Sequence, residues 1–389
     1  MKVHLNISAQ NSADWERVLA KGYDRPAAQP DSRFVDEAMA LGELAEPLGF
    51  DGVWVPEHFG TPYVMTPNPL QTLTWFAARS ERLSLGTIVC VLPWWNPIRL
   101  AHQIAYLDIL SKGRYETIGI GRGVAKTEFE AVGVPRNESR DRFDECLDIL
   151  ELALTRERFS YEGDIFKIPE TSIRPQPFSK DLVDRLYGAS ATGTSLDRLA
   201  ARGLKPIFVG NKSLAEAAAD VRRVNTARGK AGLAPTQSKN ILFMYCTRSE
   251  AEAREAVEFV TKANQDVALH YGFHEPENFE GVKGYEDYAA GSGSATSLTK
   301  DGKFVGTNKG YDASNLLIGT PETIFERIVE GQQTVSFSEI CIAASFGGMP
   351  FDAAEKSLRL FAEAVLPAVQ AMDAPLHPAC MGDAEAATA

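Results

Sequence analysis

Residues 83–110 read LSLGTIVCVLPWWNPIRLAHQIAYLDIL, and this stretch indicates the fold. Residues 83–92 form a mostly apolar run, as expected of a strand that is buried on both faces. Residues 99–110 then place apolar side chains at helical spacing and predict an amphipathic helix. A doubly buried strand that is followed at once by a helix is typical of a parallel sheet covered by helices.

The same alternation recurs along the chain. We predict strands at 3–7, 52–56, 83–92, 115–121, 186–190, 205–210, 240–247 and 339–345. The helices that follow them are predicted at 32–48, 69–80, 99–110, 139–155, 195–203, 213–231, 249–271 and 352–372. Eight strand–helix units over this length favour an α/β fold, a (β/α)8 TIM barrel, rather than a Rossmann sheet with a second domain. The barrel would occupy residues 1–373 as a single domain.

Two segments lack this alternation. Residues 272–311 are rich in Gly, Ser, Thr, Asn and Lys, and a long irregular segment inside a compact domain predicts a lid-like mobile insertion near the C-terminal face. Residues 374–389 predict a disordered tail.

The composition excludes several classes of partner. The chain has 40 Lys and Arg against 52 Asp and Glu, a net charge of −12, and no basic cluster. Such a protein is a poor candidate for binding nucleic acid or an anionic membrane surface. The N-terminus lacks the apolar core of a signal peptide, and no run of apolar residues is long enough to span a membrane, so we expect a cytoplasmic protein.

The cysteines carry no signal of a disulfide framework or a zinc ribbon. They are odd in number and far apart, and no pair has C-x-x-C spacing: Cys90, Cys146, Cys246, Cys341 and Cys380.

A glycine-rich stretch, TIGIGRGV at 117–124, follows the fourth predicted strand. A dinucleotide fingerprint needs a third glycine, which would fall at Val124 or Lys126, so the stretch does not match it. In a barrel it lies instead at the functional, C-terminal end of a strand. Three glycines there indicate that something large approaches the backbone, with Arg122 beside it; a tight corner with a solvated arginine is the alternative.

Two further candidates stand at strand ends. Residues 191–195, ATGTS, place hydroxyls and Gly193 at a helix N-terminus, which is a ready phosphate site, although Ser195 could be an ordinary helix cap. His58 lies at the end of the second predicted strand, next to Glu57, and is a candidate active-site residue.

Other residues have less specific interpretations. Tyr63, Trp94 and Trp95 would make one side of the barrel mouth aromatic, with core packing as the alternative. His270 and His274 have the spacing of a metal-binding pair, but no third ligand is evident, so we predict no metal site.

Several stretches together resemble the luciferase-like flavin monooxygenases, most closely the luciferase α-subunit type. They occur in the family's order and extend from the first strand to the last helix: GFDGVWVPEHFG, LSLGTIVCVLP with NP and R following, LSKGRYETIGIGRGVAKTEFEAVG, IGTPETIFERI and SFGGMPFDAAEKSLRLFAEAVLPAV. The family fold is a (β/α)8 barrel, which agrees with the strand count.

The resemblance implies an FMNH2-dependent, two-component monooxygenase. A separate NAD(P)H:flavin reductase would supply reduced FMN, which would react with O2 to give a flavin C4a-hydroperoxide and oxygenate a small apolar substrate such as an aldehyde or ketone. It also implies a dimer formed through the helices at 69–80 and 97–110, and we expect a homodimer.

The resemblance also assigns site residues. His58 matches the family's active-site histidine, and a non-prolyl cis peptide is expected at Ile88–Val89. The remaining cofactor-binding positions are Gly121, Arg122, Arg140, Thr192, Gly193 and Ser195.

The chain departs from the luciferase α-subunit at three of these places. Gly121 replaces a cysteine beside the flavin, Phe59 replaces a second histidine, and Ala191 replaces a glutamate near the phosphate. Light emission and linear aldehydes are therefore not expected. We expect a bulkier apolar substrate, a cyclic ketone, terpenoid or aromatic compound, against Phe59, Tyr63, Trp94 and Trp95.

Three alternatives remain open. One is a deazaflavin-dependent oxidoreductase on the same fold, which would transfer a hydride without oxygen. The others are a non-catalytic flavin-binding protein and a metal-assisted hydrolase, and the latter lacks the expected ligands at strand ends.

Overall fold

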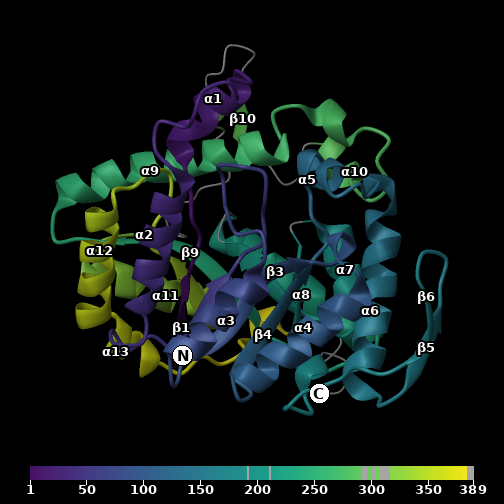
Figure 1. The fold of residues 1–389 in the computed structure, drawn as a ribbon. Coiled ribbons are helices and arrows are strands. Elements are labelled where there is room, and N and C mark those ends of the chain that lie inside the picture. Colours follow the sequence, from purple (N-terminus) through teal and green to yellow (C-terminus); the bar gives the residue numbers. More distant parts are fainter. Residues whose placement is uncertain (191, 210–211, 291–295, 299–303, 307–315, 383–389) are drawn as a thin grey trace.

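A computed structural model describes residues 1–190, 192–209, 212–290, 296–298, 304–306 and 316–382. Within these residues, eight parallel strands close into a barrel (Figure 1): β1 (Lys2–Asn6), β2 (Gly52–Val55), β3 (Ser84–Val91), β4 (Tyr115–Gly121), β7 (Leu186–Ala189), β8 (Lys205–Val209), β9 (Ser238–Cys246) and β13 (Phe337–Ala343). Strand β8 pairs with β9, and β13 pairs with both β9 and β1, which closes the sheet. The predicted TIM barrel is confirmed.

Helices surround the barrel, and local sequence signals set where several of them begin. They are α2 (Asp31–Glu43), α3 (Pro69–Arg79), α4 (Pro97–Leu110), α6 (Ser139–Thr155), α7 (Gly193–Ala201), α8 (Leu214–Lys230), α11 (Pro321–Val335), α12 (Phe351–Ala364) and α13 (Leu366–Gln370). Proline opens α3 and α4, where the missing N–H costs nothing, and the preceding Asn68 and Asn96 accept hydrogen bonds from the first turn. Apolar faces such as Leu100, Ala101 and Ile104 of α4 are fully buried.

The floor of the barrel is closed by buried charges. Lys239 Nζ lies 2.9 Å from Glu339 Oε2 and donates to Thr117 Oγ1 at 2.8 Å, and His4 Nε2 lies 2.8 Å from the same Glu339 oxygen. The ring of Trp54 stacks on His4. Paired charges tolerate this burial, so the amino-terminal half of the barrel is filled and the open space lies at the other end.

Helix α9 (Glu250–Tyr271) differs from the prediction. We expected it to follow β9 as a wall helix, but it crosses the mouth of the barrel (Figure 1), and α11 packs beside α8 in the wall. Periodicity alone could not separate the two, because both helices are amphipathic and only the surface that each covers differs.

The sharp loop after β13 seats α9. Gly347 has φ +59°, and a Cβ atom there would lie 1.9 Å from the carbonyl oxygen of Phe259 in α9. Glycine is required by both the conformation and the close approach.

The described residues also form several short helices and strands outside the eight barrel strands and the surrounding helices. Short helices α1 (Trp15–Leu19), α5 (Lys126–Ala131) and α10 (Glu286–Ala289), the antiparallel hairpins β5 (Phe159–Glu162)–β6 (Lys167–Thr171) and β10 (Thr296–Leu298)–β11 (Phe304–Gly306), and strand β12 (Leu317–Gly319) complete the described chain. Of the expected lid, residues 272–290 contain a 3-10 turn (Pro276–Phe279) and α10, whereas 291–295, 299–303 and 307–315 lie outside the described residues. Mobility of this segment stays a prediction.

The expected disordered tail is wrong for residues 374–382. Gln332 Nε2 donates to the Pro375 carbonyl at 2.8 Å, Asn225 Nδ2 donates to the Cys380 carbonyl at 2.6 Å, and Cys380 is fully buried. The sequence of this segment has no periodic apolar pattern from which the packing could be predicted. Residues 383–389 lie outside the described residues. All five cysteines are free and buried, and no helix of the described residues is long and apolar enough to cross a membrane.

We expect Gly347→Ala to lower the free energy of unfolding by about 2–5 kcal/mol, since left-handed strain of about 1–2 kcal/mol adds to a clash of about 1–3 kcal/mol. Urea unfolding monitored by circular dichroism measures this. Gly232→Ala is the control, because Gly232 also has positive φ, +72°, but no atom within 4 Å of its Cβ position. Equal losses in the two variants would show that the contact with α9 contributes nothing.

Candidate active site

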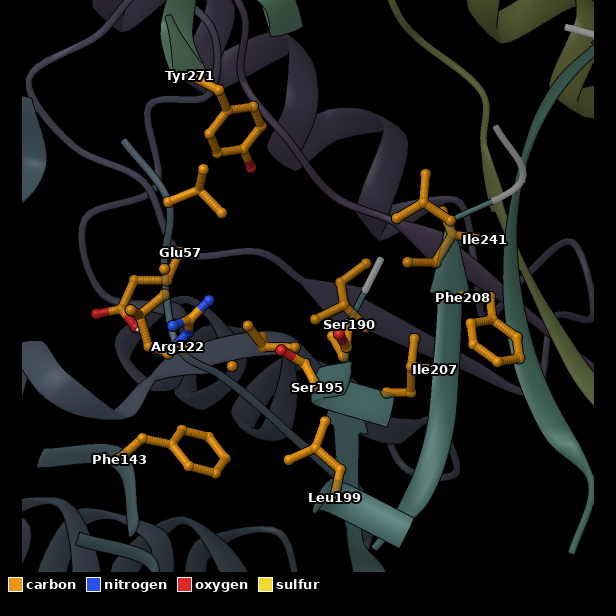
Figure 2. Close-up of a pocket in the computed structure, with 18 of the residues that line it drawn as sticks. Glu57, Arg122, Phe143, Ser190, Ser195, Leu199, Ile207, Phe208, Ile241 and Tyr271 are labelled. Atoms are coloured by element: carbon orange, nitrogen blue, oxygen red, sulfur yellow. Dashed lines mark hydrogen bonds between the residues drawn. The ribbon is translucent and has the colours of Figure 1, made fainter. Parts of the chain in front are cut away.

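A cavity of about 630 Å³ opens at the carboxyl ends of the strands, beneath α9. Eight predicted site residues line it: His58, Tyr63, Ile88, Val89, Gly121, Arg122, Arg140 and Ser195. Figure 2 shows Tyr271 of α9 on the opposite side of this space from Phe143 and Leu199. Its volume is within the range of small-molecule and cofactor sites.

One wall of the cavity is apolar and closely packed. The Ile88–Val89 peptide bond of β3 is cis, as the resemblance predicts. Behind it, Gly121 of β4 leaves no room for a larger residue, because a Cβ atom there would lie 2.6 Å from Val89 Cγ2. The glycine therefore allows the Val89 side chain to occupy the space next to β4.

One end of the cavity is positively charged. Arg122 Nη2 donates to the Gly284 carbonyl at 2.5 Å, and the guanidinium lies 4.0 Å from the centre of the Tyr285 ring. Its Nη1 is buried and has no hydrogen-bond partner among the described residues. Burial lowers the pKa of Arg140, and the positive charges of Arg122 and Arg198 lower it further. An anion would relieve this repulsion and satisfy the free donor.

The start of α7 contributes to the same end through one side chain. Ser195 lines the cavity, whereas Thr192 is buried beside it, with Thr192 Oγ1 donating to Ser195 Oγ at 3.2 Å. Ser195 lies inside α7 and is not its cap, because the residue before the helix is Thr192, whose side chain makes no cap hydrogen bond. Gly193 faces away from the cavity, because a Cβ atom there would lie 2.4 Å from Arg223 Nη1. Thr192 and Gly193 therefore do not line the cavity as predicted.

His58, which also lines the cavity, belongs to a compact polar cluster. His58 Nδ1 lies 3.0 Å from Glu128 Oε1 and 3.2 Å from His270 Nε2, and His270 Nε2 lies 3.2 Å from Glu128 Oε2. Burial alone would raise the pKa of Glu128, but the two imidazoles outweigh it and lower that pKa to about 2. Burial lowers the pKa of His270 to about 4. The carboxylate is thus ionised and His270 neutral at pH 7.

Two aromatic residues complete this cluster. The Tyr271 hydroxyl lies 3.1 Å from His58 Nε2, and the Tyr63 ring stacks on His270 with centroids 5.0 Å apart. Thr61 Oγ1 lies 3.1 Å from His270 Nδ1. Every ring nitrogen of the two histidines therefore has a polar neighbour.

Sequence reasoning missed Glu128 and Tyr271 and misplaced His270. Glu128 follows the glycine-rich loop in α5, and its burial could not be read from a polar stretch. The predicted His270–His274 pair is split, because His274 Nδ1 contacts the Ala268 carbonyl. The nitrogens of His58 and His270 and a Glu128 oxygen instead lie within 4.8 Å of one another, which could hold a metal ion.

Of the four predicted aromatic substrate residues, only Tyr63 lines the cavity. Phe59 and Trp94 pack on each other with centroids 5.0 Å apart, and Trp95 Nε1 donates to Glu57 Oε2 at 3.1 Å. None of the three lines the cavity, so the core-packing alternative describes them; Tyr63 alone reaches the cavity. Aromatic side chains from the lid side, Tyr271, Phe273 and Tyr288, line it instead.

Glu57 itself is buried in the cavity wall. Burial raises its pKa to about 8, even though the Val91 backbone N–H and Trp95 donate to its Oε2. The folded protein thus holds a proton on this carboxyl across neutral pH.

Comparison with known proteins gives a consistent result. A family model described as luciferase-like monooxygenase matches residues 19–336. Uncharacterized protein y4vJ of Sinorhizobium fredii is 26% identical over 353 residues, which is 90% of this chain and 95% of that protein. The oxygenase component of the flavin-dependent trigonelline monooxygenase of Acinetobacter baylyi is 30% identical over 154 residues, 39% of this chain and 42% of the relative. The chain thus aligns with less than half of that enzyme's length.

Solved structures share the fold. Monooxygenase RslO1 from Streptomyces bottropensis superposes with a TM-score of 0.74 at 25% identity, covering 95% of this chain and 100% of that one. The oxygenating constituent of 3,6-diketocamphane monooxygenase of Pseudomonas putida, in complex with FMN, gives 0.67 at 18% identity, with 96% and 99% covered. An F420-dependent secondary alcohol dehydrogenase gives 0.65 at 15%, with 95% and 98% covered. The last two show the fold alone.

We expect Glu57→Gln to change how stability depends on pH. Because the pKa of Glu57 is raised from 4.5 to about 8 in the folded state, wild-type stability falls as pH rises through this window. The glutamine variant lacks this titration, so it should lose less stability between pH 5.5 and 8.5, by at least about 1.4 kcal/mol, the equivalent of one pKa unit. Urea unfolding at both pH values measures it. Glu46→Gln, at a partly exposed carboxyl of lowered pKa, should follow the wild type.

Proposed function

Because the chain belongs to the luciferase-like monooxygenase family, a family of flavin-dependent enzymes, we propose that it is the oxygenase component of a two-component monooxygenase. It would use reduced FMN and O2 to oxygenate a small apolar organic molecule. The observation that carries the proposal is one cavity lined by Arg122, whose buried Nη1 has no partner among the described residues, by the apolar β3 residues Ile88 and Val89, and by His58.

The charged end fits a phosphate. Arg122, Arg140 and Ser195 would hold it, since guanidinium groups and a hydroxyl supply charge-assisted donors. The repulsion between the arginines, which lowers the pKa of Arg140, would be offset by two negative charges. A separate reductase is proposed as the source of the reduced flavin, since the trigonelline relative is the oxygenase component of its monooxygenase.

The middle of the cavity fits a flat aromatic ring system. Ile88, Val89 and Gly121 would lie against it, because they present an apolar wall without polar side chains. Reduced FMN would supply the activation of O2, which side chains do not provide. The protein would orient the ring and exclude water through its apolar lining.

The far end would hold the substrate and handle protons. His58 would bind or release a proton at Nε2, which lies 3.1 Å from the Tyr271 hydroxyl. The aromatic residues Tyr63, Tyr271, Phe273 and Tyr288 favour an apolar substrate, and we propose a ketone, terpenoid, aromatic compound or aldehyde of this class. Phe59, Trp94 and Trp95 do not line the cavity, so they would affect the substrate only indirectly.

The function is tested with reduced FMN from an added NADH:flavin reductase, ¹⁸O₂ and a panel of cyclic ketones, terpenoids, aromatic compounds and linear aldehydes. We expect one labelled oxygen atom in the product, measured by mass spectrometry, and preference for the bulkier members. Turnover only with a reduced deazaflavin, without oxygen, would establish the alternative oxidoreductase instead. Tight flavin binding without any product would favour a non-catalytic flavin-binding protein.

The phosphate end is tested by comparing FMN with riboflavin in fluorescence titrations. We expect Arg122→Ala to weaken FMN binding about tenfold to a hundredfold, the loss of a hydrogen bond to a charged group of about 1.5–3 kcal/mol, and to leave riboflavin binding unchanged. His58→Ala should lower turnover far more than FMN affinity. Arg158→Ala, at an exposed pair with Glu170, is the matched control. An equal loss for both flavins would refute the assignment of Arg122 to the phosphate.

We also propose a homodimer formed through α3 and α4, which lie side by side. Trp75 on α3 and Tyr106 and Leu110 on α4 are 47%, 54% and 41% exposed, and Tyr106 and Leu110 lie one turn apart on the same face of α4. Light scattering after size exclusion should give a dimer for the wild type and a monomer for Tyr106→Glu. Val257→Glu, on exposed α9, should remain dimeric. A monomeric wild type would contradict this proposal.

A further inference from the structure

Five side chains from three segments form a continuous polar chain from the cavity into the protein: Tyr271, His58, Glu128, His270 and Thr61. We propose that Tyr271 is a catalytic proton donor on the cavity side of His58, and that Glu128 and His270 are positioning residues that fix the protonation of His58. The catalytic part rests on the proposed function. The protonation pattern does not.

The Glu128 carboxylate decides which His58 nitrogen carries hydrogen. An ionised carboxylate can only accept hydrogen bonds, and its Oε1 already accepts one from the Phe59 backbone N–H at 3.1 Å. His58 Nδ1 lies 3.0 Å from the same oxygen. A bare nitrogen at that distance would be repelled, so Nδ1 must be the protonated atom.

The second oxygen of Glu128 determines which nitrogen of His270 carries the hydrogen. Oε2 is buried and has no hydrogen-bond partner among the described residues; His270 Nε2 lies 3.2 Å from it and also 3.2 Å from His58 Nδ1, so a hydrogen on Nε2 would face Oε2 rather than the protonated Nδ1 of His58. A buried carboxylate oxygen without a donor is costly, so His270 carries its hydrogen on Nε2. Its Nδ1 then accepts from Thr61 Oγ1 at 3.1 Å. The two imidazoles therefore flank one carboxylate, with one imidazole nitrogen beside each oxygen.

This arrangement leaves His58 Nε2 as the basic atom, and it faces Tyr271. Because Nε2 of the neutral ring is an acceptor, the Tyr271 hydroxyl at 3.1 Å donates to it. Burial raises the pKa of Tyr271 well above its usual value, so the hydroxyl keeps its proton. Tyr271 also lines the cavity, and Figure 2 shows it at the cavity edge.

The proton balance is simple. When His58 is protonated at both nitrogens, its Nε2–H donates to the Tyr271 oxygen while the Tyr271 O–H passes its proton to an oxygen anion in the cavity. The Nε2–H bond of His58 and the O–H bond of Tyr271 break, one O–H bond forms on the Tyr271 oxygen and one on the anion, and no electrons are transferred. The imidazolium charge that precedes this step is stabilised by Glu128.

The contacts of His58 with His270 and Tyr271 depend on the position of helix α9 over the barrel mouth. His270 and Tyr271 are its last two residues, and Gly272 ends it with φ +70°. Both rings contact His58, at 4.7 and 5.7 Å between centroids. A shift of α9 would remove the donor and a positioning residue together.

The protonation pattern is tested without cofactor or substrate. Protein labelled with ¹⁵N-histidine gives long-range ¹H–¹⁵N correlations that identify the protonated nitrogen of each ring. The signals of His58 and His270 are recognised among those of the six histidines because each is missing from the spectrum of its own variant, His58→Gln or His270→Gln. We expect hydrogen on Nδ1 of His58 and on Nε2 of His270. A bare Nδ1 on His58 overturns the proposal, as does a stoichiometric metal ion in the purified protein, because the three groups would then be ligands.

The catalytic part is tested by Tyr271→Phe. We expect kcat to fall about 100-fold, the usual contribution of general acid–base catalysis, with flavin affinity and the His58 protonation pattern unchanged. Tyr161→Phe is the control, because Tyr161 also donates to a carboxylate, Asp148, but lies in the β5–β6 hairpin away from the cavity. Wild-type turnover in Tyr271→Phe would refute the role of Tyr271. Absence of turnover in the wild type would refute the proposed function alone.

Glu128→Gln separates positioning from folding. The amide offers one acceptor and one donor, so we expect His58 to populate both protonation patterns in the same spectra, with kcat lowered and KM retained. An unchanged His58 spectrum in a folded Glu128→Gln variant would refute the positioning role of Glu128.

Discussion

The buried carboxylate of Glu128 is the contact on which the site depends. It lies in α5 and joins the end of β2, through His58 and the Phe59 backbone, to the last turn of α9, through His270. These segments are far apart in the chain, and a buried carboxylate without those partners would be strongly unfavourable. This cluster of Glu128 with two histidines therefore favours one position of α9 over the mouth, and with it one shape of the cavity.

The cavity has two chemically different ends, and the barrel explains the difference. The loop after β4 and the first turns of α6 and α7 bring Arg122, Arg140 and Ser195 together, where burial and the charges of Arg122 and Arg198 lower the pKa of Arg140. The end of β2 and α9 bring a histidine, a carboxylate and aromatic rings together. Because parallel strands all finish at the same mouth, an anion-binding end and a proton-handling end face one space.

The sequence predicted the barrel well for a physical reason. Strands buried on both faces read as continuous apolar runs, and the helices that cover them carry regular apolar faces, so burial leaves a local pattern. His58, Gly121, Arg122 and Ser195 could be placed at strand ends for the same reason. The Ile88–Val89 cis peptide was found by resemblance and not by pattern.

The residues that pattern could not place are those whose role depends on contacts across the barrel. Distant partners decide whether α9 covers the wall or the mouth and whether Glu128 is solvated or held by buried histidines. They also decide whether Trp94 and Trp95 face a cavity or the core. The sequence by itself determined the order of strands and helices and the polar residues at their ends. The tertiary structure alone decided that His270 and Tyr271, rather than Phe59, Trp94 and Trp95, meet His58 at the cavity, because hydrogen bonding and burial between distant segments leave no periodic signal in the chain.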